Sequence, residues 1–413
     1  MNKSLIFLPI LLVMLSSCEG EQQTRIPELV RKPYLQSAIA DSVTILWRTD
    51  SASSAQVAYR ISAASDWTEV QGVTRMTNTG VYENEVVLTQ LDPDTRYEYQ
   101  ILSNGHQLLG DQPLYFTSPV DAEDTVFSFF AVGDIGEPVE TEGTPDQLGR
   151  ALSHYVDSLR FGLLLGDIIY PDGKSKVYDQ NLFQYFGEVF PYVPVFTVLG
   201  NHDWHEPEEN YMQEWKLPGN EHYYSFDQGN VHFVALDTKN GEMYDYDKQV
   251  SWLKNDLATL SGEQDWIIVF LHHNGKSCTY KHDYAGVVSL YPVFEQYGVD
   301  LVLNGHAHTY ERLKPMDGQG EIAPNDSSTV NEYHRPNGFM SITVGSGGKL
   351  RGIGSDPNPW SPDPDSCKYP GLVAAFMHDW AFLALDIEGN RLTGRALTTE
   401  NLEVVDQFVI DKR

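Results

Sequence analysis

The chain has 413 residues, enough for two or three domains, and 41% of them are hydrophobic, which permits a large buried core. Asp and Glu together outnumber Lys and Arg by 58 to 28, which gives a net charge of -30. A surface of this sign repels nucleic acids and anionic membranes, so we expect no nucleic-acid partner. It also repels phosphorylated molecules, so a function in phosphate chemistry requires a local source of positive charge.

The first 17 residues have the pattern of a secretory signal peptide. Lys3 precedes an apolar run over residues 5–15, which is too short to cross a bilayer as a helix. The run ends in a Leu-Ser-Ser-Cys sequence at Cys18, which resembles a bacterial lipobox, where the chain is cleaved before a Cys that receives a lipid. The alternative is an ordinary signal peptide with an incidental thiol at Cys18. We expect secretion across the inner membrane, a lipid anchor on Cys18 with a tether over residues 18–30, and, because Glu19 follows the Cys, an outer-membrane lipoprotein.

Residues 31–118 predict an all-β domain. Apolar side chains alternate at Val43, Ile45 and Trp47, and the same period returns over residues 55–61 and 97–101. Turn clusters separate these short strands, and no helical pattern comes between them. About ninety residues with this pattern of short strands and turns predict a β-sandwich of roughly the size of an immunoglobulin-like domain.

Residues 119–413 predict an α/β domain. Nearly continuous apolar runs alternate with helical or loop segments, as expected for strands buried on both faces. An amphipathic helix is predicted over residues 246–260, a long loop over 349–370, and closing strands over 382–387 and 392–410. The main apolar runs are residues 127–132, 163–165, 195–199, 231–236, 266–271 and 299–303.

Five of these runs end in a turn that carries Asp, Asn or His, mostly beside Gly. The carboxyl ends of strands in an α/β sheet gather ligands at one edge, so the five turns are expected to converge. Two cations about 3.5 to 4 Å apart must share a bridging carboxylate, and Asp167 is the obvious bridge. The other expected donors are Asp134, Asn201, His272, His306 and His308.

The ordered series GDxG, GDxxY, GNHD, VxxH and GHxH resembles the purple acid phosphatases of the metallophosphoesterase superfamily. The segments 32–36, 223–226 and 344–348 also look like parts of that family. Gly136 stands where most of the superfamily has a metal-binding His, and Tyr170 stands three residues after the bridging Asp, as in the purple acid phosphatases. The resemblance implies a fibronectin-III-like N-terminal sandwich followed by a four-layer α/β/β/α metallophosphoesterase domain.

The resemblance also implies roles for individual residues. A phenolate prefers Fe(III), so the Tyr170 site is expected to hold Fe(III) and the second site Zn, Mn or Fe(II). His202 and His282 match the histidines that surround the metals and contact the substrate. Carried over, the ligands of the first metal are Asp134, Asp167, Tyr170 and His308, and those of the second are Asp167, Asn201, His272 and His306.

The expected activity is that of an acid phosphatase, in which a metal-bound hydroxide attacks a small phosphate monoester. His202 would orient the ester and, with His282, protonate the leaving alcohol. The alternatives are a phosphodiesterase or nucleotidase with the same metals, and a surface binding protein with a vestigial phosphatase core. Cys278 and Cys367 could form a disulfide or remain two separate buried thiols.

Overall fold

The computed structural model describes residues 25–122, 125–204, 209–260, 266–323, 329, 331–334, 336–350, 367–369 and 371–413. The expected signal peptide, Cys18 and the start of the tether lie outside the described residues, so the lipid anchor stays a prediction. Within the described ranges, no helix is long and apolar enough to cross a membrane.

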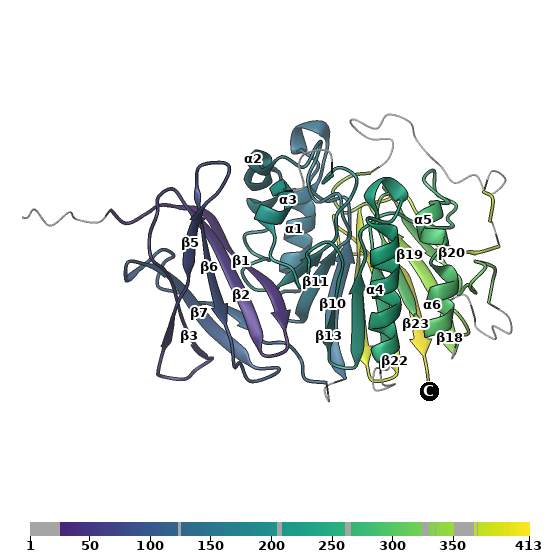
Figure 1. The fold of residues 1–413 in the computed structure, drawn as a ribbon, viewed down its shortest axis with the longest axis horizontal. Coiled ribbons are helices and arrows are strands. Elements are labelled where there is room, and N and C mark those ends of the chain that lie inside the picture. Colours follow the sequence, from purple (N-terminus) through teal and green to yellow (C-terminus); the bar gives the residue numbers. More distant parts are fainter. Residues whose placement is uncertain are drawn as a thin grey trace, which may run out of the picture.

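The N-terminal domain is a sandwich of two antiparallel sheets (Figure 1). Trp47 and its neighbours on one sheet pack against Val57, Tyr99 and Ile101 on the other, because alternate side chains of each strand face the same interior. The prediction of an all-β domain is therefore confirmed. One sheet has the order β1 (Leu29–Ile39), β2 (Ser42–Thr49), β6 (Tyr82–Leu88), β5 (Val73–Met76); the other has β4 (Thr68–Gln71), β3 (Ala55–Ile61), β7 (Arg96–Ser103), β8 (His106–Gln107), with β9 (Leu114–Thr117) also on β7.

The C-terminal domain contains two seven-stranded sheets that face each other across an aromatic core. The rings of Phe129 and Phe161 each lie 5.2 Å from the ring of Phe233 on the opposite sheet. The first sheet has the order β12 (Val195–Thr197), β11 (Leu159–Leu164), β10 (Val126–Val132), β21 (Ala381–Glu388), β22 (Arg391–Thr398), β23 (Val404–Asp411), β18 (Glu332–His334). The second has β13 (Tyr224–Gln228), β14 (Val231–Ala235), β15 (Trp266–Phe270), β16 (Leu301–Asn304), β19 (Met340–Val344), β17 (Tyr310–Leu313), β20 (Val373–Met377).

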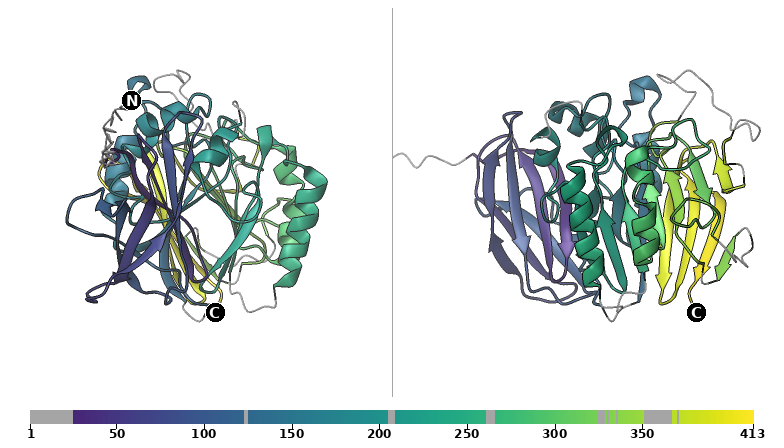
Figure 2. Two further views of the ribbon diagram at one scale, coloured as in Figure 1. Left: turned by 60° about the vertical axis from the view of Figure 1, so that its left-hand side comes forward. Right: turned by 45° about the vertical axis from the view of Figure 1, so that its right-hand side comes forward.

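Helices cover the outer faces of both sheets and complete the four layers (Figure 2). On the second sheet, α4 (Tyr246–Thr259) buries Leu253 and Leu257 against side chains of β14 and β15, and α6 (Tyr291–Tyr297) packs beside it. On the first sheet, α1 (Pro145–Ser153) leads to Tyr155, whose ring packs on Phe382 of β21. The short helices are η1 (Val139–Thr141), α2 (Ser175–Tyr178), η2 (Asp179–Phe183), α3 (Glu209–Glu214), η3 (Lys239–Gly241) and α5 (Ala285–Val288).

The strands that carry the five motif turns run parallel within each sheet. In the first sheet β10, β11 and β12 are parallel neighbours, and in the second β15 and β16 are. Their carboxyl ends therefore lie at one edge of each sheet, and the face-to-face packing brings the two edges together. The predicted convergence of the five turns thus depends on both sheets.

Candidate metal centre

Glycines allow the motif turns to approach one another closely. Asp134, Asp167 and His306 have φ values of 58°, 49° and 67°, a left-handed conformation that is costly for residues with a side chain. A Cβ added at Gly200 would lie 2.2 Å from Oδ1 of Asp167. Gly200 is therefore needed for the turn that carries Asn201 to pack on the turn that carries Asp167.

Four buried side chains form the first group of donors. The hydroxyl oxygen of Tyr170 lies 2.8 Å from Oδ1 of Asp134 and 3.0 Å from Oδ2 of Asp167, within hydrogen-bond distance of both. Nε2 of His308 lies 3.3 Å from Oδ1 of Asp134 and 3.5 Å from the Tyr170 hydroxyl. The structure thus brings together the four residues predicted for the first metal.

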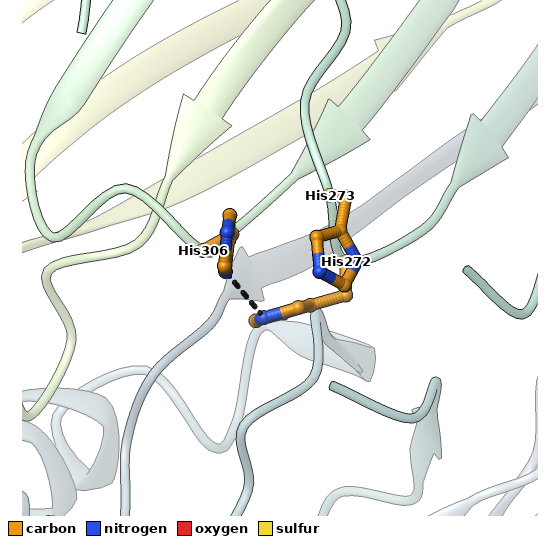
Figure 3. Close-up of side chains that lie close together, drawn as sticks. All are labelled: His272, His273 and His306. Atoms are coloured by element: carbon orange, nitrogen blue, oxygen red, sulfur yellow. Dashed lines mark hydrogen bonds between the residues drawn. The ribbon is translucent and has the colours of Figure 1, made fainter. Parts of the chain in front are cut away.

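The second group of donors shares Asp167 with the first. Oδ2 of Asp167 lies 3.4 Å from Nε2 of His272, and this nitrogen lies 3.3 Å from Oδ1 of Asn201. Nδ1 of His306 is 3.2 Å from the same His272 nitrogen (Figure 3). One carboxylate oxygen therefore faces both groups of donors, as a bridging ligand must.

Backbone hydrogen bonds orient the two carboxylates. Oδ1 of Asp167 accepts from the backbone N–H of His202 at 2.8 Å, and Oδ2 of Asp134 accepts from that of His306 at 2.8 Å. Each carboxylate is thus held through one oxygen and faces the other donors with its second oxygen. Such outer contacts fix ligand geometry before a cation binds.

The electrostatics of the donors fit two bound cations. Burial opposes the protonation of His272, but the carboxylate of Asp167 outweighs it and raises the pKa of His272 to about 9. Burial, with the carboxylates of Asp134 and Asp167, holds the pKa of Tyr170 well above 10. Without another cation this cluster therefore retains protons, which bound metal ions would replace. Carboxylate, amide and phenol oxygens with imidazole nitrogens suit hard and borderline metals, so these residues fit a dinuclear centre.

Each of the two domains matches a known protein family. Residues 31–120 match the purple acid phosphatase N-terminal domain, and residues 127–310 match the calcineurin-like phosphoesterases. The chain belongs to the purple acid phosphatase family. The family resemblance and the predicted order of an all-β domain followed by an α/β domain are therefore confirmed.

Individual relatives are similar over most of this chain. Purple acid phosphatase 18 of Arabidopsis thaliana is 30% identical over 308 residues, which cover 67% of this chain and 62% of the relative. Acid phosphatase type 7 of Danio rerio is 28% identical over a region that covers 68% of this chain and 69% of the relative. The solved structure of purple acid phosphatase PPD1 from yellow lupin (Lupinus luteus) seeds is 18% identical, with a TM-score of 0.77 over 92% of this chain and 74% of that one, which shows the same fold. The chain thus spans less than two thirds of the Arabidopsis protein.

The two histidines predicted to surround the metals, His202 and His282, have different environments. The ring of His202 lies 4.5 Å from that of Tyr170, and its Nε2 is 4.0 Å from Oδ2 of Asp167. His282 is more exposed, at 44% of its side chain, and its Nδ1 lies 3.2 Å from Oδ2 of Asp283. The structure therefore brings His202 to the centre, whereas the described contact of His282 is with an acidic neighbour in its own loop.

Two lysines at the centre are absent from the motif series. Nζ of Lys281 donates to the backbone oxygen of His306 at 2.8 Å and lies 3.4 Å from Nδ1 of that residue. Nζ of Lys349 lies 4.1 Å from the centre of the Tyr170 ring and 2.8 Å from Oε2 of Glu137. No motif marks either lysine. The only indication in the sequence is that Lys281 directly precedes His282 and that Lys349 directly follows the glycine-rich segment 345–348.

His273 lies beside the second donor group. Its ring is 4.2 Å from that of His306 (Figure 3), and its Nδ1 is 3.0 Å from the hydroxyl of Thr238. His272, His273 and His306 offer ring nitrogens close enough to hold one metal ion. The hydrogen bond to Thr238 and the packing on His306 favour a supporting role for His273.

A disulfide anchors the loop that carries Lys281 and His282. Cys278 is bonded to Cys367, which is 89 residues away in the chain. The backbone N–H of Cys278 also donates to the buried carboxyl of Glu311 at 2.8 Å. The loop is therefore attached at its start to two distant parts of the C-terminal domain.

Proposed function

We propose that this protein is a dinuclear-metal acid phosphatase that hydrolyses phosphate monoesters. The observation that carries the proposal is the position of Asp167, whose Oδ2 lies 3.0 Å from the Tyr170 hydroxyl and 3.4 Å from His272. One carboxylate can thus bridge two cations that have different further donors. Relatives named as acid phosphatases support the same activity.

The donor chemistry supports different metals at the two positions. Tyr170, as a phenolate, favours Fe(III), whereas Asn201, His272 and His306 suit Zn, Mn or Fe(II). An Arabidopsis thaliana relative that is 25% identical carries the name Fe(3+)-Zn(2+) purple acid phosphatase 12. We therefore assign Fe(III) to the first position and a divalent ion to the second.

When bound, the two cations lower the pKa of coordinated water and neutralise charge on the phosphoryl oxygens. His202 is placed to handle the leaving group. Its Nδ1 is 2.5 Å from the carbonyl oxygen of Pro171, which can only accept, so the proton stays on Nδ1 and Nε2 exchanges protons with the substrate. With 24% of its side chain exposed, His202 can contact the ester oxygen and, when both of its ring nitrogens are protonated, give the Nε2 proton to the leaving alcohol and keep the proton on Nδ1. His282 stays a candidate for a second proton donor.

Lys281 supplies fixed positive charge beside the second donor group. Its ammonium group is held on the backbone oxygen of His306 and can contact a phosphoryl oxygen of the bound ester. With the cations, it provides the local positive charge that a chain of net charge -30 needs in order to bind a phosphate ester.

The proposal is tested by loading the protein with iron and zinc. We expect two metal ions per chain, hydrolysis of an aryl phosphate faster than of a bis-aryl phosphate, and a visible tyrosinate-to-Fe(III) absorption band. Tyr170→Phe should remove the band and leave the fold intact, whereas Tyr178→Phe, which alters another fully buried tyrosine, should keep it.

A fully metal-loaded protein that does not hydrolyse the aryl phosphate would contradict the phosphatase function. If the bis-aryl phosphate is the faster substrate, the protein is a phosphodiesterase. A colourless iron-loaded wild type would contradict only the assignment of Fe(III) to Tyr170.

A further inference from the structure

The two histidines of the second donor group present different ring nitrogens to the same point. His272 presents Nε2 and His306 presents Nδ1, and these atoms are 3.2 Å apart (Figure 3). A ring nitrogen binds a cation only when it carries no proton. Each neutral ring must therefore hold its single proton on the nitrogen that points away from the centre.

The outer nitrogen of His272 has an unambiguous partner. Nδ1 lies 2.8 Å from the carbonyl oxygen of Leu165, which has no proton to donate. In the neutral ring the proton of His272 therefore stays on Nδ1, and Nε2 is left with a free lone pair. The backbone alone determines which nitrogen of this ring binds a metal.

The outer nitrogen of His306 has a side-chain partner. Nε2 lies 2.6 Å from the hydroxyl of Tyr284, whose oxygen can accept a hydrogen bond. On the other side of the ring, Nδ1 lies 3.4 Å from Nζ of Lys281, and an ammonium group is only a donor. A proton on Nδ1 would face this donor, so Lys281 favours the proton on Nε2, and the Tyr284 hydroxyl then accepts a hydrogen bond from it.

Contacts independent of His306 hold the Tyr284 ring in place. A Cβ at Gly241, where φ is +84°, would lie 2.0 Å from Cδ1 of Tyr284, so the ring lies directly on the glycine backbone. The Tyr284 ring also packs against His273, with ring centres 4.8 Å apart. Asp283, the preceding residue, accepts hydrogen bonds from Lys368 at 2.6 Å and from Tyr369 at 2.9 Å. The hydroxyl is thus placed by the fold before any metal binds.

We propose that Tyr284 is a positioning residue that keeps the proton of His306 on Nε2 and so reserves Nδ1 for the second metal. This inference rests on the proposed function, because it concerns the same centre. Removing an outer hydrogen bond of this kind commonly weakens metal affinity by about 10- to 100-fold.

The experiment compares wild type with Tyr284→Phe, which keeps the ring and its packing and removes only the hydroxyl. Zinc affinity at both sites is measured by chelator competition. The protonated nitrogen of His306 is read from ¹⁵N NMR of the metal-free protein, at a pH high enough for the neighbouring His272 ring to be neutral, with the signal assigned from His306→Gln. Tyr246→Phe is the matched control, because Tyr246 is exposed and its hydroxyl lies near Ser289.

We expect the wild-type ring to carry its proton on Nε2 and Tyr284→Phe to give a mixture of the two forms. The variant should bind the second zinc about 10- to 100-fold more weakly, with the first site and the melting temperature nearly unchanged. Wild-type affinity in the variant, or a wild-type proton on Nδ1, would overturn the inference and leave the phosphatase function intact. A wild type that binds no second metal would contradict the function itself, while the NMR measurement would still decide the role of Tyr284.

Discussion

The two oxygens of Asp167 have separate roles. Oδ1 accepts the backbone N–H of His202, and Oδ2 faces donors of both groups. Gly200 leaves just enough space for this arrangement, since any side chain there would collide with the carboxylate. The residue types at the centre therefore follow from the chemistry of the metals, and the glycines follow from the short distances between the turns.

Lys281 is expected to contribute to the binding of the phosphate ester. Lys281→Met should raise KM for an aryl phosphate and the inhibition constant of inorganic phosphate by roughly 10- to 100-fold, because a charged hydrogen bond contributes about 1.5 to 3 kcal/mol. Steady-state kinetics with and without phosphate measure both. Lys254→Met, on the exposed face of α4, is the control. Unchanged constants in Lys281→Met would show that the lysine does not contact the phosphate.

Away from the metal centre, a histidine links two strands of the second sheet to the helix that covers them. Nδ1 of His232 on β14 lies 2.7 Å from Asp227 on β13, and its Nε2 lies 2.9 Å from Asp256 on α4. Burial by itself lowers the pKa of the His232 ring, but the two carboxylates have the larger effect and raise this pKa to about 9. The protonated ring therefore connects the helix layer to the sheet.

This link predicts how stability depends on pH. The folded pKa of about 9 is above the ordinary value of 6.5, so the stabilisation is complete below about pH 6.5 and is lost as pH rises through 9. We expect the free energy of unfolding to fall by about 2 to 3 kcal/mol across this interval. Urea unfolding at pH 6 and pH 9 measures the loss, which should be much smaller in His232→Gln. An equal loss in both proteins would assign the pH dependence to other groups.

Buried ion pairs join the N-terminal sandwich to the C-terminal domain. Arg31 on β1 and Arg48 on β2 both contact Glu214 on α3, at 2.7 Å and 3.0 Å, and all three side chains are at most 1% exposed. α3 follows the turn that carries Asn201 and His202. The sandwich is thus packed against the segment that supports the metal centre, and the two domains form one structural unit.

Removing the shared carboxylate should destabilise the whole molecule. Glu214→Gln leaves each of the two buried arginines with only one other carboxylate, so their charges are only partly compensated and the change should cost about 3 kcal/mol. Glu188→Gln removes the exposed pair with Lys32 between the same two domains and should cost at most about 1 kcal/mol. Thermal and urea unfolding compare the two variants. A similar small effect in both would show that the buried pairs do not hold the domains together.

Much of the fold could be predicted because local patterns determine strands and helices. The run over 127–132 became β10, and the helix predicted over 246–260 became α4. The pairing of β10 with β21 could not be predicted, since the two strands are about 250 residues apart and no local period encodes their contact. The strands β17, β19 and β20 were missed, although they complete the second sheet.

The sequence by itself determined which residues can act as metal donors, because each motif pairs a donor type with a turn at the end of a buried strand. It also determined the family, through the order of those motifs and the place of Tyr170. Only the tertiary structure decided that Oδ2 of Asp167 faces both donor groups, and that Lys281 and Tyr284 lie on either side of His306. These contacts join segments distant in the chain, so they depend on how two sheets and a disulfide-anchored loop pack rather than on any local pattern.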